Sequence, residues 1–244
     1  MKLHNKAMVV LSGGQDSTTC LFWAKANFEE VCAITFDYGQ KHSAELKAAE
    51  LIAHIANVEH EIVRVPQILR SRSPLTNPNE KLETYKNYEE MDSIIGNRVE
   101  LTFVPMRNAF FLTLAANYAL EKDCYALVTG VCEQDNANYP DCRLKFIQKQ
   151  EETINEALGL NNQFHIFTPL INLTKAQTVL LSKQLGDDCW QAISYSHTCY
   201  AGEFPPCGKC HSCVLRAQGF KEANEIDPLI KRVEFEEYYN ELGN

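Results

Sequence analysis

The hexapeptide Ser-Gly-Gly-Gln-Asp-Ser at residues 12–17 constrains this chain more than any other feature. It lies between an apolar run at 7–11 and a helix-like stretch at 18–24, a pattern that predicts a buried parallel strand, a tight turn and a helix. The two glycines let the backbone turn sharply and approach a ligand closely. The helix N-terminus directs free N–H groups at the turn, so we predict a pocket for an anion of phosphate size. The residues predicted to form it are Leu11, Ser12, Gly13, Gly14, Gln15, Asp16 and Ser17.

Asp16 is unexpected in a phosphate pocket, because a carboxylate repels phosphate. A divalent cation that bridges Asp16 to the phosphates explains it, which predicts Mg²⁺ bound together with ATP. The alternative is that the glycines only form a turn and that Asp16 and Ser17 only cap the helix. The segment lacks the Gly-Lys-Ser/Thr of a P-loop and the spacing of a dinucleotide fingerprint. It resembles the Ser-Gly-Gly-x-Asp-Ser loop of the ATP pyrophosphatases, which cleave ATP between its α- and β-phosphates.

Length and charge limit the classes of protein to which the chain can belong. Its 244 residues suffice for one large α/β domain with a small appendage. The net charge of −9, from 23 basic and 32 acidic residues, argues against general nucleic-acid binding, which usually needs a basic face. No stretch approaches the roughly 18 apolar residues of a membrane span, and residues 1–6 do not read as a signal peptide. We therefore expect a cytoplasmic protein with small-molecule partners.

Strand-like and helical patterns alternate along the chain, which predicts a Rossmann-like parallel sheet with helices on both faces. In such a sheet, ligands bind beyond the carboxyl ends of the strands. Besides 7–11, the predicted strands are 31–36, 61–65, 125–130 and 164–167, and the predicted helices are 43–56, 108–120, 147–158 and 175–185.

Two parts of the chain are expected, a nucleotide-binding domain over 1–190 and a cysteine-rich tail over 191–244 that ends in an acidic helix. Within the first part, 71–100 breaks the alternation, because it holds prolines, asparagines and few apolar residues. A loop of that length in a compact domain is usually a lid or lacks structure. We predict a mobile flap over the active site, with a plain exposed insertion as the alternative.

Four of the ten cysteines are clustered in the tail, and their C-x7-C-x2-C-x2-C spacing suits one structural zinc ion. An iron–sulfur cluster is the alternative, but a bacterial ferredoxin run would continue with x3-Cys-Pro, which is absent here. His197 and His211 are possible substitute ligands. The predicted ligands are Cys199, Cys207, Cys210 and Cys213, whereas Cys20, Cys32, Cys124, Cys132 and Cys189 are scattered and predicted to be buried apolar residues.

Further candidate residues follow the predicted strands, at the ligand-binding edge. Arg107 and Lys175 each open a helix and are predicted to meet a phosphate or carboxylate, with solvated surface positions as the alternative. Residues 139–143 (Tyr-Pro-Asp-Cys-Arg) crowd an aromatic ring, a carboxylate, a thiol and a guanidinium into one short loop. The second and fourth strands supply Phe36, Tyr38, Gly39, Gln40 and Gly130 as candidates for the nucleotide, and the following loop supplies Asp135, Tyr139, Asp141 and Arg143 as candidates for a substrate.

Together these motifs resemble the 7-cyano-7-deazaguanine synthase family of the queuosine pathway, from residue 7 to about residue 220. That family usually has glycine where this chain has Met106, and Ser-Gly where this chain has Ala137-Asn138, departures that concern the substrate pocket. The resemblance implies an adenine nucleotide alpha hydrolase-like fold and a homodimer. Its motifs here are 12–17, 36–42, 107–108, 130–131, 139–143 and 199–220.

The reaction that the resemblance implies converts 7-carboxy-7-deazaguanine and ammonia to a nitrile with ATP, through an adenylated carboxylate and an amide. We assign pyrophosphate binding to Ser12, Gly13, Gly14 and Ser17, and magnesium binding to Asp16. Substrate anions are assigned to Arg107, Arg143 and Lys175, the guanine-like edge to Asp135 or Asp141, and ring stacking to Tyr139. Zinc is expected to fix the tail, and with it substrate-binding residues near Tyr195 to Tyr200, without taking part in the chemistry.

Three alternatives remain open at this point. The first is a tRNA-thiolating enzyme on the same scaffold, with Cys142 as a candidate for sulfur relay; the acidic charge weighs against it. The second is a related ligase that joins a deazaguanine to another amine, for which Met106 and Ala137-Asn138 leave room. The third is a zinc module for protein contacts without catalysis, which leaves the loop at 12–17 unexplained.

Overall fold

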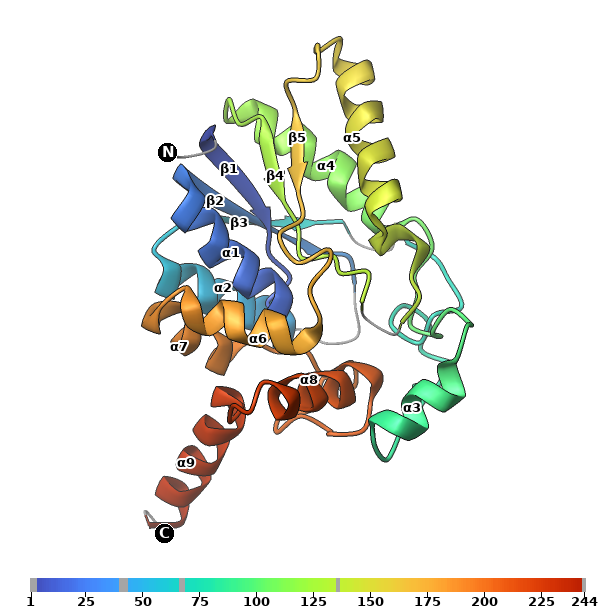
Figure 1. The fold of residues 1–244 in the computed structure, drawn as a ribbon, viewed down its shortest axis with the longest axis vertical. Coiled ribbons are helices and arrows are strands. Elements are labelled where there is room, and N and C mark those ends of the chain that lie inside the picture. The colour runs from blue at the N-terminus through green and yellow to red at the C-terminus, as the bar shows by residue number, and fades with distance from the viewer. Residues whose placement is uncertain (1–3, 40–43, 66–68, 135–136, 243–244) are drawn as a thin grey trace.

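Parallel strands form the centre of the molecule, and helices lie on both faces (Figure 1). The computed structural model describes residues 4–39, 44–65, 69–134 and 137–242. The strands are β1 (His4–Val10), β2 (Phe28–Asp37), β3 (Glu59–Arg64), β4 (Ala126–Val128) and β5 (His165–Phe167). The helices are α1 (Gln15–Asn27), α2 (Ala44–Ala56), α3 (Tyr88–Ile95), α4 (Arg107–Glu121), α5 (Leu144–Leu158), α6 (Lys175–Gln184), α7 (Asp187–Tyr195), α8 (His211–Glu222) and α9 (Pro228–Leu242), with a short 3₁₀ helix at Pro140–Cys142.

The sheet has the order β3-β2-β1-β4-β5, and all neighbouring strands are parallel. The chain therefore reverses its direction of winding beside β1, and a crevice forms there at the carboxyl ends of β1 and β4. The backbone continues the pairing just past β1, where Leu11 N donates to Ile34 O at 2.8 Å. This register sets the turn at 12–14 directly over the crevice.

Alternate side chains of β1 enter two separate hydrophobic cores. Ala7, Val9 and Leu11 pack with α1, α2 and α7 on one face of the sheet. Met8 packs with α4 and α5 on the other. Successive side chains of a strand point to opposite faces, so a strand that is covered on both sides must be apolar throughout.

The tail shares the main core instead of lying apart from it. Phe220 of α8 packs with Cys189 and Ile193 of α7 in the core beneath α1. Segment 71–100, predicted as a lid, contains α3, whose Met91 and Ile95 pack against α8. Tyr85 N also donates to Lys209 O at 2.8 Å. A movement of this segment stays a prediction, as does the division at residue 190.

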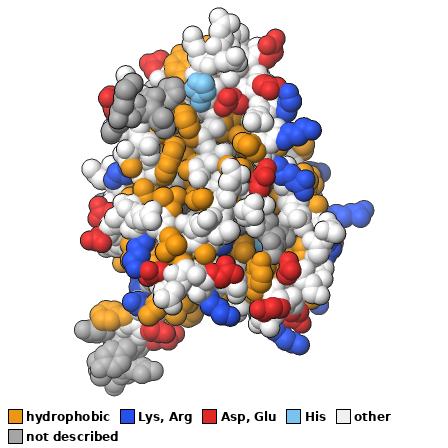
Figure 2. Space-filling view, viewed as in Figure 1, with side chains coloured by type: hydrophobic (Ala, Val, Ile, Leu, Met, Phe, Trp, Pro, Cys, Tyr) orange, Lys and Arg blue, Asp and Glu red, His pale blue; other side chains and the backbone are white. Residues whose placement is uncertain are grey.

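The predicted α/β sheet with helices on both faces is confirmed, as are the predicted strands and helices within a few residues. Helices α3, α7 and α8 were not predicted. Acidic and basic side chains are interspersed around the face drawn in Figure 2, and apolar side chains show in its middle. Among the described residues, no helix combines the length and the apolar character needed to cross a membrane.

Candidate active site at the carboxyl end of the sheet

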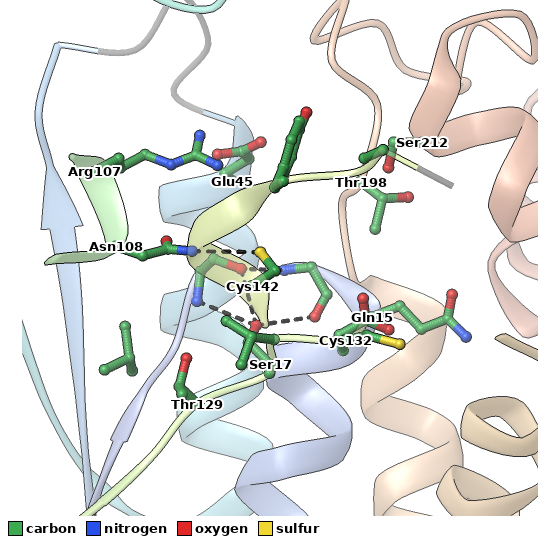
Figure 3. A pocket seen from close by; sticks show the side chains of 18 of the residues that line it. Gln15, Ser17, Glu45, Arg107, Asn108, Thr129, Cys132, Cys142, Thr198 and Ser212 are labelled. Carbon is green, nitrogen blue, oxygen red and sulfur yellow. Dashed lines mark hydrogen bonds between the residues drawn. The ribbon is translucent and has the colours of Figure 1, made fainter. Parts of the chain in front are cut away.

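A cavity of about 300 Å³ lies at the carboxyl ends of the strands (Figure 3). It gathers residues that are up to 206 positions apart in the sequence, from Val10 to Arg216. Of the predicted site residues, those that line it are Leu11, Ser12, Gly14, Gln15, Asp16, Ser17, Phe36, Tyr38, Arg107, Gly130, Tyr139 and Lys175. Gly13, Gly39, Asp141 and Arg143 do not line it, and Gln40 and Asp135 lie outside the described residues.

Two walls of this cavity recur below. The loop wall is residues 11–17, the turn between β1 and α1. The cysteine wall is residues 197–216, which contains the four clustered cysteines and the first turns of α8.

Hydrogen bonds fix the shape of the loop wall. Ser12 N donates to Ser17 Oγ at 3.1 Å, the two hydroxyl oxygens lie 3.0 Å apart, and Ser17 Oγ donates to Gly14 O at 3.1 Å. Gly14 occupies the N-cap of α1 and has no side chain with which to cap it. The positive end of the helix dipole therefore faces the cavity, where an anion is stabilised.

Glycine is required at two contacts around this turn. Gly13 has φ +84°, and a Cβ there would lie 2.3 Å from Glu45 O of α2. A Cβ on Gly130, two residues after β4, would lie 3.0 Å from Ser17 N. The predicted reason for these glycines was approach to a ligand, but at Gly13 the close neighbour is the helix packed behind the loop.

Asp16 and Lys175 form an ion pair across the cavity. Lys175 Nζ lies 3.0 Å from Asp16 Oδ1 and 2.8 Å from Oδ2, and the two side chains are 10% and 26% exposed. From the sequence, Asp16 was assigned to magnesium and Lys175 to substrate anions, with no contact expected between them. An acidic oxygen donor beside a phosphate-sized pocket fits Mg²⁺, and the neighbouring ammonium supplies a second cation for the same anion.

Arg107, Tyr38 and Glu45 form the side of the cavity nearest to β2. Arg107 hydrogen-bonds Tyr38, and Figure 3 shows the Glu45 carboxylate beside the Arg107 guanidinium. Burial raises the pKa of Glu45 to about 7, although the charge of Arg107 acts in the opposite direction. Sequence reasoning missed Glu45, since it resembles any acidic residue in the first turn of a helix.

Tyr139 is held by a buried acid that the sequence did not single out. Glu100, 2% exposed, accepts hydrogen bonds from Thr102 N at 2.6 Å and from the Tyr139 hydroxyl at 3.3 Å. Burial raises the pKa of Tyr139, so its hydroxyl stays protonated. Phe103 packs against the ring at 5.4 Å between centroids. The hydroxyl is thus anchored away from solvent, and the ring lines the cavity, as stacking on a flat ligand requires.

Asp141 lies in the 3₁₀ helix Pro140–Cys142 and contacts the start of α4. Its Oδ2 accepts a hydrogen bond from Asn108 N at 3.4 Å, and its carbonyl oxygen accepts one from Asn108 Nδ2 at 3.1 Å. Burial raises the pKa of Asp141, although Arg107 lowers it. Arg143 is exposed at the start of α5. The substrate roles of both residues stay predictions.

The departures at Met106 and Asn138 have a backbone explanation. Both residues lie in the left-handed region, with φ of 65° and 55°, where glycine carries no steric penalty. Asn tolerates this region well, and Asn138 Nδ2 also donates to Gly96 O at 2.9 Å and to Arg98 O at 3.0 Å. Met106 is 68% exposed and does not line the cavity.

The four predicted metal ligands lie together in the cysteine wall. Their sulfur atoms are all within 4.8 Å of one another, and Cys207 is the only one of the four that is not fully buried. Hydrogen bonds from the Cys210 and Cys213 thiols lower the pKa of Cys199. Four converging sulfurs with one thiolate already favoured fit a tetrahedral metal site.

The cysteine wall contributes more to the cavity than was predicted. His197, Thr198 and Tyr200 line the cavity from the stretch near 195–200 in which substrate-binding residues were predicted. Sequence reasoning did not place His211, Ser212 and Arg216 there, and these three line it as well. The guanidinium of Arg216 is anchored by Asp227 Oδ2 at 2.6 Å and Ser196 Oγ at 2.8 Å. A signal was available in the density of polar residues around the cysteines, but it also suits a solvated loop.

The sequence and the fold of this chain are similar to those of known proteins. A family model described as "Queuosine biosynthesis protein QueC" matches residues 6–224. The 7-cyano-7-deazaguanine synthase of Laribacter hongkongensis is 45% identical over 228 residues, which are 93% of this chain and 95% of that protein. The protein of the same name from Chromobacterium violaceum is 44% identical over 95% of each chain. A solved NH3-dependent NAD synthetase from Campylobacter jejuni aligns with a TM-score of 0.42 at 18% identity, covering 74% of this chain and 63% of that one.

Proposed function

The chain belongs to the family of the queuosine biosynthesis protein QueC, and on this premise we propose that it makes 7-cyano-7-deazaguanine from 7-carboxy-7-deazaguanine, ammonia and ATP. It is an ATP-dependent enzyme of queuosine precursor synthesis that forms carbon–nitrogen bonds. The observation that carries the proposal is the shared cavity. The loop wall, Lys175, Arg107 and Tyr139 all line one chamber, so a nucleotide and a flat anionic substrate can meet in it.

The first step overcomes the poor reactivity of a carboxylate. One substrate carboxylate oxygen attacks the α-phosphorus of ATP, which forms an acyl adenylate and releases pyrophosphate. The loop wall holds the departing pyrophosphate through its helix N-terminus and the hydroxyls of Ser12 and Ser17. Lys175 stabilises the same charge. Bound Mg²⁺, held by Asp16, would add Lewis-acid stabilisation of the phosphate oxygens.

Two further displacements give the nitrile. Ammonia adds to the acyl carbon and AMP leaves, so the product is an amide and one proton is released. The amide oxygen then attacks the α-phosphorus of a second ATP and releases a second pyrophosphate, and loss of AMP together with both N–H protons of the amide leaves the carbon–nitrogen triple bond. The same residues serve both activations, because in each an oxygen on the same carbon attacks an α-phosphorus bound in the same place.

The remaining residues position the substrate. Arg107, fixed by Tyr38, faces the substrate carboxylate, and Tyr139 stacks on the ring. Glu45 lies beside Arg107 and, with a pKa near 7, accepts a proton released by ammonia. Zinc, held by the four cysteines, would fix the cysteine wall and take no part in the bond changes.

The proposal also covers the type of substrate, the location and the oligomeric state of the enzyme. The acidic net charge of −9 supports free small molecules over nucleic acid as substrates. The family resemblance further suggests a cytoplasmic homodimer.

Product analysis tests this function directly. Protein incubated with 7-carboxy-7-deazaguanine, ammonium and Mg-ATP is expected to yield the nitrile and two AMP per nitrile, measured by mass spectrometry and nucleotide chromatography. Asp16→Asn is expected to reduce AMP release about a thousandfold. Asp188→Asn, on the exposed end of α7, is the matched control. A product in which the deazaguanine is joined to another amine would refute the nitrile assignment, and an unimpaired Asp16→Asn rate would refute the role of Asp16.

A further inference from the structure

His211 is a buried polar side chain of the cavity that has no role in the steps above. It is the first residue of α8, it is 3% exposed, and it lines the cavity. Within the described part of the chain, no group hydrogen-bonds either Nδ1 or Nε2. A buried polar atom without a partner costs about 1–3 kcal/mol, and native proteins pair nearly all such atoms. The missing partner is therefore expected to come from the ligand that fills the cavity.

The metal site does not explain this histidine. The four cysteine sulfurs converge within 4.8 Å of one another and already supply the four ligands of a tetrahedral ion. His211 is not a member of that group, although it follows Cys210 directly in the sequence.

The position of His211 favours one part of the ligand. The two charged groups that act on it are Glu100, which anchors Tyr139, and Lys175, which pairs with Asp16. The ring is thus within electrostatic range of the Lys175–Asp16 pair at the loop wall and of Glu100 on the Tyr139 side of the cavity, where the base is stacked in the proposed function. A neutral imidazole offers one N–H donor and one acceptor. Phosphate oxygens only accept, whereas a guanine-like base presents N–H donors beside carbonyl and ring-nitrogen acceptors.

We propose that His211 hydrogen-bonds the polar edge of the guanine-like substrate and is a specificity-determining residue contributed by the cysteine wall. The inference rests on the proposed function, since it takes the base from it. The cysteine cluster thereby also positions a substrate contact, because Cys210, a predicted metal ligand, is joined to His211 by one peptide bond.

Separate binding measurements test this assignment. Titration calorimetry of wild type and His211→Phe is made with 7-carboxy-7-deazaguanine and, independently, with Mg-ATP. We expect His211→Phe to bind the deazaguanine about tenfold more weakly, the effect of one lost hydrogen bond, and Mg-ATP within twofold of wild type. His211→Gln, which keeps a donor and an acceptor, is expected to bind the deazaguanine within about threefold of wild type. Lys221→Met, on the exposed end of the same helix, is the control.

The outcomes separate this inference from the proposed function. Wild-type turnover to the nitrile is the reference, and its absence refutes the function. If the wild type makes the nitrile but His211→Phe binds the deazaguanine as tightly as the wild type, only the assignment of His211 is refuted. The assignment is also refuted if His211→Phe loses as much affinity for Mg-ATP as for the deazaguanine. It is refuted, too, if His211→Gln loses as much deazaguanine affinity as His211→Phe. If His211→Phe loses its metal, His211→Ala carries the same expectations.

Discussion

The loop wall and the cysteine wall enclose the same cavity but are built in different ways. The loop wall takes its shape from a strand, a turn and a helix that follow one another in the chain, and the main core supports it from behind. The cysteine wall lacks regular structure from 197 to 210 and is held by four converging sulfurs and by the anchored Arg216. A cavity wall can thus take its shape from local backbone geometry or from side chains that converge on one another, and this chain uses one of each.

Removal of a metal ligand gives the largest expected effect and tests whether the two walls are independent. In Cys210→Ser, we expect the metal content to fall from about one ion per chain to near zero, and nitrile formation to fall at least a thousandfold, because metal binding free energy stabilises such segments. Mg-ATP binding is expected to persist within about fivefold. Elemental analysis and calorimetry measure both. Equal loss of ATP binding would show that the loop wall depends on the cysteines; iron in the wild type would contradict zinc.

The cysteine wall is also held by a buried ion pair that needs no metal. Arg216 is 4% exposed and pairs with Asp227 at 2.6 and 2.9 Å. Asp227→Ala leaves a buried guanidinium uncompensated, so the unfolding free energy is expected to fall by about 3–5 kcal/mol. Glu225→Ala breaks the more exposed pair with Lys183 and is expected to cost at most about 1 kcal/mol. Chemical denaturation with metal present measures both unfolding free energies. Similar losses in the two variants would contradict a stabilising role of the buried Arg216–Asp227 pair.

Glu45 makes the support behind the loop wall pH-dependent. Its pKa rises from the ordinary value of 4.5 to about 7 on folding, so the folded state binds the proton more tightly. The unfolding free energy should therefore fall as the pH rises from 4.5 to about 7, by at most roughly 3 kcal/mol. Glu45→Gln is expected to remove that slope, whereas Glu50→Gln, exposed on the same helix, is expected to keep it. Urea unfolding between pH 5 and pH 8 measures the difference, and identical slopes in all three proteins would contradict it.

The smallest effect concerns a position that belongs to neither wall. Met106→Gly relieves about 1–2 kcal/mol of left-handed backbone strain, but the glycine adds freedom to the unfolded chain. We expect a net gain of about 0.5 kcal/mol, measured by thermal or chemical unfolding. Asn138→Gly is the contrasting variant, because it loses two hydrogen bonds and should cost about 1 kcal/mol. A gain in both would show that the side chain of Asn138 contributes nothing.

The difference between the walls also explains how much could be predicted from the sequence. The turn at 12–17 and the strands around it were predictable, because each depends on neighbours within a few residues. The convergence of the four cysteines was predictable from their spacing alone. The contribution of His211 and Arg216 to the cavity was not, since it depends on how α8 packs. Gly219 shows this dependence, because a Cβ there would lie 2.4 Å from Lys175 Cγ.

The pair of Asp16 and Lys175 shows the same limit. Each residue was singled out for its own reason, but nothing local indicates that two residues 159 positions apart form an ion pair. Helix α3 was missed because prolines and asparagines surround its short apolar pattern, and its partner is α8 rather than the sheet. Long-range packing, and not local propensity, decides such positions.

The distance along the chain between the two walls has a consequence for biosynthesis on the ribosome. The loop wall emerges first, yet the opposite side of its cavity ends with Arg216, so the site cannot close until most of the polypeptide has been made. Contacts between residues this far apart form late, because closing a long loop must precede them. An unfinished chain therefore carries the loop wall without the residues that complete the other side of its cavity.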